Sequence, residues 1–102
     1  MNAAITVQII FSPVFRAYFH CHERKLTMEK ENPTVIDLLR QLSIEVAGKI
    51  DPLIFEKDAA FISAGLMVQV NDRIYTGTML NQEPVPLKDQ AVVSLLYYVS
   101  GG

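Results

Sequence analysis

The sequence has 102 residues, half of them apolar, and a formal net charge of −2 at pH 7. This length suits one small domain with its own core, and no linker or repeat marks a second domain. The Lys and Arg residues are scattered, so no basic patch indicates nucleic acid or an anionic membrane as a partner. A single cysteine, Cys21, excludes an internal disulfide. With neither a signal peptide nor a membrane-spanning stretch in view, we expect a cytoplasmic protein.

Two strands are predicted near the start of the chain. Residues 5–11 place apolar side chains at every second position, which is typical of a strand with one buried face. Ser12-Pro13 ends this strand, because proline cannot donate to a sheet. Residues 24–28 predict a second strand, antiparallel to the first. The residues between the two strands are expected to form a wide loop.

The clearest helix is predicted to begin after Thr34. Thr34 is a good N-cap, and Asp37 three residues later completes a pair that resembles a capping box. Apolar side chains then recur at helical spacing, and Gly48 is a plausible end of the helix. The predicted buried stripe consists of Val35, Leu38, Leu39, Leu42 and Val46.

The segment 51–65 gives weaker signals, although Asp51-Pro52 favours a short helical turn. Residues 66–70 return to strand periodicity. Asn71-Asp72 predicts a turn, since both residue types tolerate the left-handed conformation. Residues 74–75 then continue as a short return strand.

Residues 76–89 hold one glycine and two prolines and are expected to be mostly connection. Residues 91–99 predict the last strand, whose strongly apolar character favours a central place in the sheet. The order strand, strand, helix, strand, short strand, strand predicts an α+β fold, in which one main helix covers a mixed sheet of four to five strands. The side chains of the last strand expected to face the helix are Val93, Leu95 and Tyr97.

Two glycines, Gly101 and Gly102, follow the last predicted strand. A segment without side chains is narrow and can enter the active site of another protein, where a β-carbon would clash. A terminal carboxylate can be activated as an acyl-adenylate and then accept a sulfur or an amine nucleophile. Terminal glycines are often only a frayed end. Here they follow a β-grasp strand order in a chain of suitable length, so we favour a functional tail.

Several short motifs occur in a fixed order: Phe15-Arg16, Asn32-Pro33-Thr34-Val35 with Leu38-Leu39, Val70-Asn71-Asp72-Arg73, Pro86-Leu87-Lys88-Asp89, Val93-Ser94-Leu95-Leu96 and Val99-Ser100-Gly101-Gly102. In this order they resemble the MoaD/ThiS family of ubiquitin-like sulfur carriers, and the MoaD branch more closely. The resemblance covers most of the chain. It implies a β-grasp domain over residues 1–98 and a flexible tail over residues 99–102. One departure is Gln90, where the family usually has glycine.

The resemblance also implies a mechanism. A ubiquitin-activating-type adenylyltransferase uses ATP to adenylate Gly102, and a sulfur donor converts the adenylate to a thiocarboxylate. In the MoaD branch the loaded tail enters a large synthase subunit and delivers sulfur to the pterin precursor of the molybdenum or tungsten cofactor. Gly101 then supplies clearance, while Val99 and Ser100 set the extended approach. The chain is accordingly expected to be a protein cosubstrate, not an enzyme, with no bound cofactor.

The family resemblance further implies an apolar docking patch on the uncovered face of the sheet. Strand alternation places Ile10 and Leu96 on that face, with Ile74 nearby, and clustered exposed aliphatic side chains often mark a partner site. The alternative is that the segment 51–65 covers them.

The sequence also fits other functions. The same tail chemistry can serve a thiazole or amino-acid pathway, or a ubiquitin-like modifier that is joined to lysines. A β-grasp interaction module with an inert tail is a further alternative. No metal site is expected at His20-Cys21-His22, because Cys21 points away from both histidines in an extended segment and no second cluster completes four ligands. No catalytic triad, carboxylate pair or phosphate-binding loop is predicted.

Overall fold

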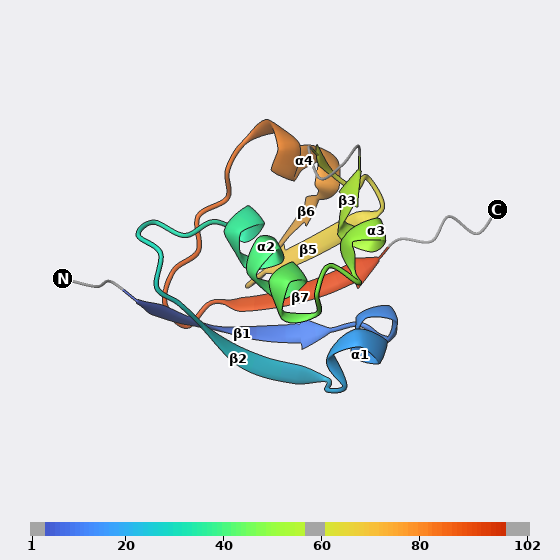
Figure 1. Cartoon of the computed structure of the whole chain (residues 1–102). Helices are drawn as coiled ribbons and strands as arrows, with labels where there is room; N and C mark the ends of the chain where they lie inside the picture. Colours follow the sequence, from blue (N-terminus) through green and yellow to red (C-terminus); the bar gives the residue numbers. More distant parts are fainter. Residues whose placement is uncertain (1–3, 57–60, 98–102) are drawn as a thin grey trace.

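The computed structural model describes residues 4–56 and 61–97. Figure 1 shows the helices and strands that these residues form. The helices are α1 (Pro13–Phe19), α2 (Val35–Glu45), α3 (Asp51–Ile54) and α4 (Gly77–Gln82). The strands are β1 (Ile5–Phe11), β2 (Glu23–Met28), β3 (Phe55–Glu56), β4 (Phe61–Ile62), β5 (Leu66–Val70), β6 (Arg73–Thr76) and β7 (Val92–Tyr97).

The larger sheet has five strands in the order β2-β1-β7-β5-β6. The pair β1–β7 is parallel, and the pairs β1–β2, β5–β7 and β5–β6 are antiparallel. The short strands β3 and β4 form a separate antiparallel pair. The predicted α+β class, the mixed sheet and the central place of the last strand are therefore confirmed.

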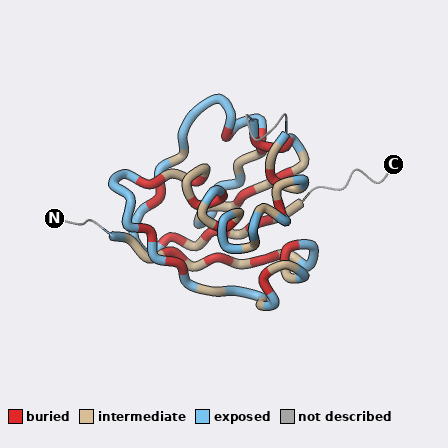
Figure 2. The backbone as a smooth tube through the Cα atoms, in the orientation of Figure 1, coloured by how far each residue is buried: buried red, intermediate tan, exposed pale blue. Residues whose placement is uncertain are grey.

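The core lies between α2 and one face of the sheet (Figure 1). Buried positions alternate with half-buried ones along β1 and β7, as expected for strands with only one covered face (Figure 2). The predicted stripe is confirmed for Val35, Leu38, Leu39 and Leu42, which are fully buried. The fifth predicted residue, Val46, follows the end of α2 and is half-buried. The fully buried side chains that the sheet contributes are Val7, Ile9, Phe11, Met28, Leu66, Val68, Val93 and Leu95.

The start of α2 is fixed by a capping box, as the sequence predicts. The Oγ1 atom of Thr34 accepts a hydrogen bond from the backbone N–H of Asp37, and the Asp37 carboxylate accepts one from the backbone N–H of Thr34 at 2.9 Å. Lys30 lies 2.7 Å from the same carboxylate. The helix ends at Glu45, and Gly48 follows in the left-handed conformation with a φ of 75°.

The carboxyl group of Asp37 makes the stability of the fold depend on pH. Burial alone would raise the pKa of Asp37, but hydrogen bonds from Lys30 and Thr34 hold it below its ordinary value of 3.8. The ionised group therefore stabilises the fold above pH 3.8, and this contribution is lost as the pH falls through the lower pKa of the folded state.

We expect Asp37→Asn to lower the free energy of unfolding by about 0.5–1 kcal/mol at pH 7, the usual size of a lost capping interaction. Its stability should also decline less steeply than that of the native protein between about pH 5 and pH 2. Urea unfolding of both proteins at several pH values measures this. If the free energy of unfolding fell equally steeply with pH in both proteins, the prediction would be wrong.

The wide loop predicted between the first two strands is wrong in part, because it contains α1. Ser12-Pro13 ends β1 but also starts this helix, since proline is well suited to the first helical turn. Phe15 and Phe19 lie one turn apart and are buried. The ring of Phe19 stacks on Phe11 with a centroid distance of 4.5 Å, which holds α1 against the end of β1.

The connection predicted for residues 76–89 is also wrong in part, because it contains α4. Thr76 is the N-cap of this helix, and its hydroxyl accepts a hydrogen bond from the backbone N–H of Met79. The side chain of Asn81 then binds β4 like a neighbouring strand. Its amide oxygen accepts from the N–H of Ile62 at 2.7 Å, and its amide nitrogen donates to the C=O of Ile62 at 3.0 Å. The short turn predicted at Asp51-Pro52 is confirmed as α3.

Two residues with a positive φ form hydrogen bonds that tie β7 to its two neighbouring strands, β5 and β1. Asn71 has a φ of 56° and exchanges two hydrogen bonds with Val92, one through its side chain. Gln90 has a φ of 69°, and its backbone N–H donates to Thr6 at 2.7 Å. Glycine adopts a positive φ without strain. This is a physical reason why the family that the sequence resembles usually has glycine where this chain has Gln90.

Candidate functional site

The site predicted from the sequence begins where β7 ends. Tyr97, the last residue of β7, pairs with Leu66 at the start of β5. The predicted site residues Val99, Ser100, Gly101 and Gly102 lie outside the described residues. The structure therefore describes two parts of the candidate site. One is the end of the sheet from which these residues continue, and the other is the set of predicted docking residues, Ile10, Ile74 and Leu96.

At this end of the sheet, β7 pairs with β5 over more residues than with β1. The pairing of β7 with β1 ends at Leu95, whose carbonyl accepts a hydrogen bond from the N–H of Ser12 at 3.1 Å. The pairing with β5 continues two residues further, to Tyr97. β7 ends at the same end of the sheet as α1 begins (Figure 1). The last two described residues of β7 are thus held from the β5 side.

The side chain of Tyr97 is partly buried and packs against the core. It lies on the face of the sheet that α2 covers, as the sequence predicts, beside the fully buried Leu95. A β-carbon placed at Gly65 would lie 3.1 Å from the Cζ atom of Tyr97 and 3.2 Å from its hydroxyl oxygen. The ring therefore lies directly on Gly65.

The predicted docking residues occupy the face of the sheet opposite α2. Ile10 and Leu96 are half-buried, and Ile74 is 50% exposed. Ile10 lies between the fully buried Ile9 and Phe11, and Leu96 follows the fully buried Leu95. Leu96 pairs with Met67, so these two side chains adjoin near the end of β7.

Ile10 and Ile74 lie at opposite ends of one row across four strands, with two polar residues between them. The pairs that define this row are Ile10 with Ser94, Ser94 with Gln69, and Gln69 with Ile74. The structure therefore places the three predicted residues on one face but does not gather them into one cluster. The neighbour that sequence reasoning missed is Met67, which strand alternation in residues 66–70 would have indicated.

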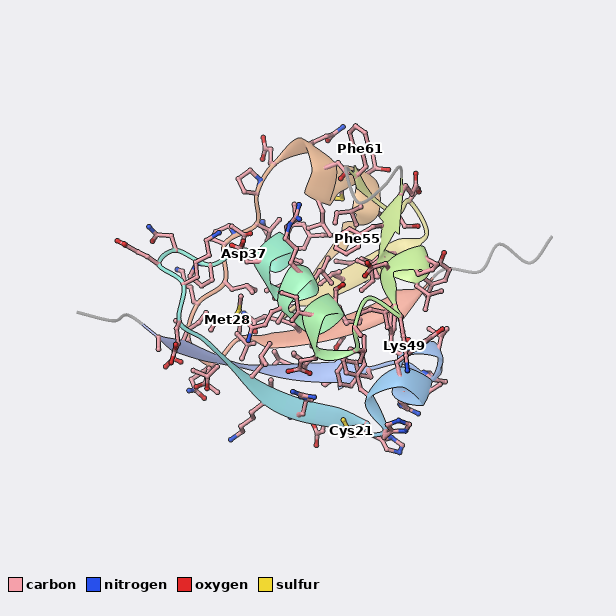
Figure 3. The ribbon with its side chains drawn as sticks, in the orientation of Figure 1. Cys21, Met28, Asp37, Lys49, Phe55 and Phe61 are labelled. Atoms are coloured by element: carbon pink, nitrogen blue, oxygen red, sulfur yellow. The ribbon has the colours of Figure 1, made fainter. Side chains whose placement is uncertain are left out.

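The segment 51–65 was the alternative cover for this face. Its described residues contact the helices instead. Asp51 accepts a hydrogen bond from the hydroxyl of Ser43 in α2, and the guanidinium carbon of Arg40 lies 5.9 Å from the centroid of the Phe55 ring. Figure 3 shows Phe55 beside α2 and α3. The described part of this segment thus packs on the helix side and leaves the opposite face open.

Other candidate sites have little support in the described residues. Cys21 is half-buried and packs against the core, while His20 and His22 are exposed around it. Within residues 4–56 and 61–97, no group of three or more His, Cys, Asp or Glu side chains is placed to hold a metal ion. In the same part of the chain, no helix has the length and apolar character needed to cross a membrane.

Comparison with known proteins identifies the family. The model of the ThiS family matches residues 13–102. The solution structure of the HVO 2177 protein of Haloferax volcanii is similar with a TM-score of 0.75 and 25% identity, over 97% of this chain and 88% of that chain. A search of curated proteins finds no match.

Two further structures are similar over nearly their whole length. Small archaeal modifier protein 1 of Methanosarcina acetivorans has a TM-score of 0.74 and 23% identity, over 99% of this chain and 100% of that chain. A putative molybdopterin converting factor, subunit 1, of Pyrococcus furiosus has a TM-score of 0.68 and 21% identity, over 93% of this chain and 99% of that chain.

The mixed sheet crossed by one main helix and these likenesses define a ubiquitin-like protein with the β-grasp fold. The chain belongs to the ThiS family, whose members are small carrier proteins rather than catalysts. It is therefore a small ubiquitin-fold sulfur carrier of this family. The family and the fold predicted from the sequence are both confirmed.

Proposed function

We propose that this chain carries sulfur on the carboxyl group of Gly102 and donates it in the synthesis of molybdopterin. The observation that carries this proposal is the ThiS family match, which runs through Gly101 and Gly102. The likeness to a molybdopterin converting factor subunit supports this pathway. A central last strand also suits the role, because it gives the tail a rigid base.

The proposed chemistry needs two steps. The Gly102 carboxylate attacks the α-phosphate of ATP on an adenylyltransferase, which forms an acyl-adenylate and releases pyrophosphate. Sulfide supplied by a sulfur donor then attacks the acyl carbon, displaces AMP and leaves a thiocarboxylate. The chain supplies the acyl group and the docking surface, and the partner enzyme supplies ATP and the catalytic groups. It thus acts in the cytoplasm as the non-catalytic small subunit of a synthase, with a larger subunit accepting its tail.

A protein modifier is the second candidate, because the small archaeal modifier protein has the same fold over the whole chain. Both functions share the acyl-adenylate and differ in the nucleophile that follows. Transfer of sulfur leaves a free carrier, whereas transfer to lysine leaves a larger conjugate that survives reducing agent. Blots of native cells under reducing conditions therefore distinguish the two candidates.

The intact mass of the chain tests the proposal. The protein is incubated with ATP, a sulfur source and extract of its native cells, and is then analysed without oxidants. The expected product is heavier by the difference between one sulfur and one oxygen. Alkylation followed by fragmentation, which separates the C-terminus from the free thiol of Cys21, locates the change at Gly102. An unmodified mass under these conditions would shift the assignment to an inert tail.

We further propose that the open face docks on the activating enzyme through Leu96 and Met67, which adjoin near the end of β7. Leu96→Glu should weaken this binding by about tenfold or more, because the new carboxylate would be buried without a partner. Thr27→Glu is the matched control, since Thr27 is exposed on β2 and β2 is the strand at one edge of the sheet. Titration calorimetry measures both affinities, and equal affinities would exclude this patch.

A further inference from the structure

The two edges of the five-stranded sheet differ in how well they are protected from pairing with another strand. β2, at one edge, carries the charged residues Glu23, Arg24 and Lys25. The side-chain amide of Gln41 in α2 also donates a hydrogen bond to the backbone carbonyl of Thr27 at 3.2 Å. Charged side chains and covered backbone groups are common protections of an edge strand. The edge formed by β2 is therefore protected.

β6, at the opposite edge, has less protection. Figure 1 shows it beside β5 and leading into α4. Its sequence is Arg73-Ile74-Tyr75-Thr76, in which one charged residue is followed by β-branched and aromatic residues that favour strand pairing. Ile74 is 50% exposed, and the described part of the chain places no strand on the outer side of β6. This edge can therefore accept a further strand.

The helix-covered face beside β6 suits a cation. Tyr75 pairs with the fully buried Val68, so its ring lies on this face. There it lines a hollow of about 310 Å³ together with Arg73 and Glu83. Among the described residues, the guanidinium of Arg73 has no hydrogen bond or ion pair. A hollow lined by an aromatic ring and a carboxylate attracts a guanidinium group that approaches from outside.

An antiparallel pair of two β6 strands has a self-complementary register. Opposite residues in such a pair point to the same face, so a two-fold axis that keeps one continuous sheet passes between two identical residues. With the axis at Ile74, the two Ile74 side chains meet on the open face. On the other face, Arg73 of each copy lies opposite Tyr75 of the second copy. An axis at Tyr75 would instead place Arg73 opposite Gly77, where β6 has already ended.

We propose that two copies of this chain form a weak two-fold dimer by pairing their β6 strands, with Ile74 at the axis. The exposed Ile74 is then buried against its counterpart, and each Arg73 gains the Tyr75 ring and the Glu83 carboxylate of the second copy. The pairing also gives a role to Ile74, which lies apart from the docking residue Leu96. Because β6 has only four residues, the interface is small and should dissociate readily.

Sedimentation of the native chain at concentrations from about 10 μM to about 1 mM tests the dimer, because weak association falls in this range. The average mass should rise toward that of a dimer. Ile74→Lys places two ammonium groups opposite each other and should keep the chain monomeric throughout. Thr27→Lys, at an exposed position on the other edge, should dimerise like the native chain. A native chain that is monomeric at about 1 mM would overturn the inference and leave this edge to a strand of another protein. A monomeric Thr27→Lys variant would also overturn it.

Disulfide trapping tests the register. In a Cys21→Ser background, Ile74→Cys should form a disulfide-linked dimer with oxidised glutathione, because the Cα atoms of directly opposite residues lie about 4.5–5.5 Å apart. Arg73→Cys should form one at least about tenfold more slowly, since Arg73 faces Tyr75 and not its own counterpart. Equal trapping at the two positions would overturn the inference. Neither experiment uses the activating enzyme, so both results are independent of the proposed function.

Discussion

Gly77→Ala should destabilise the protein by about 3 kcal/mol or more, because the added β-carbon meets backbone atoms. It would lie 1.8 Å from the carbonyl oxygen of Ser63 and 2.7 Å from the carbonyl carbon. Gly77 is the first residue of α4 and is buried. The substitution therefore requires the helix and the turn to move apart.

Neither side of this contact is free to move. Ser63 is held to Ile54 by a backbone hydrogen bond of 2.6 Å, and α4 is held to β4 by the two hydrogen bonds between Asn81 and Ile62. Urea unfolding measures the effect, and Thr78→Ala, at an exposed site in the same helix, should change stability by less than about 0.5 kcal/mol. A loss of less than about 1 kcal/mol in Gly77→Ala would mean that the turn relaxes.

Deletion of Gly102 should abolish loading of the tail and leave the melting temperature unchanged. The shortened chain still ends in a carboxylate on glycine, so its intrinsic chemistry is preserved. Its reach is reduced by about 3.3 Å, the length of one extended residue. Since a misplacement of about 1 Å can cost a hundredfold in rate, we expect at least a thousandfold loss of adenylation.

Pyrophosphate release and intact mass measure this loss in parallel. Gly101→Ala is the companion variant, because it keeps the length of the tail and adds one β-carbon. It should bind the activating enzyme normally and load slowly. The two variants together therefore distinguish the effect of tail length from the effect of an added β-carbon. Loading of the truncated chain at a rate near that of the native protein would show that the reach of the tail does not limit adenylation.

The main helix and the strands of the large sheet could be predicted because their signals are local. Thr34 and Asp37 mark the start of α2, and strand alternation assigns each residue of β1 and β5 to a face. The short elements gave no such pattern. Strands β3 and β4 have two residues each, which is too few for any periodicity. In α1, Ser12-Pro13 reads equally as the end of a strand and the start of a helix.

The sequence shows the two glycines of the candidate site, but it does not show the contacts at the end of β7 that precede them. The contact of Tyr97 with Gly65 depends on the pairing register of β5 and β7, which brings together residues far apart in the chain. The fit of Gly77 against Ser63 depends in the same way on where α4 packs. The sequence predicts a connection around Gly77 and gives only weak signals around Gly65, because sequence alone does not show which part of the chain approaches a glycine.

The parallel pairing of β1 with β7 limits the stage of synthesis at which the protein can fold. The centre of the sheet joins the first strand of the chain to its last, so a growing chain cannot close its sheet until β7 has left the ribosome. Nascent chains that stop before Tyr97 would expose the edges of β1 and β5 and become targets for chaperones and proteases. A chain cut short before β7 would therefore lack the strand that joins the two halves of its sheet.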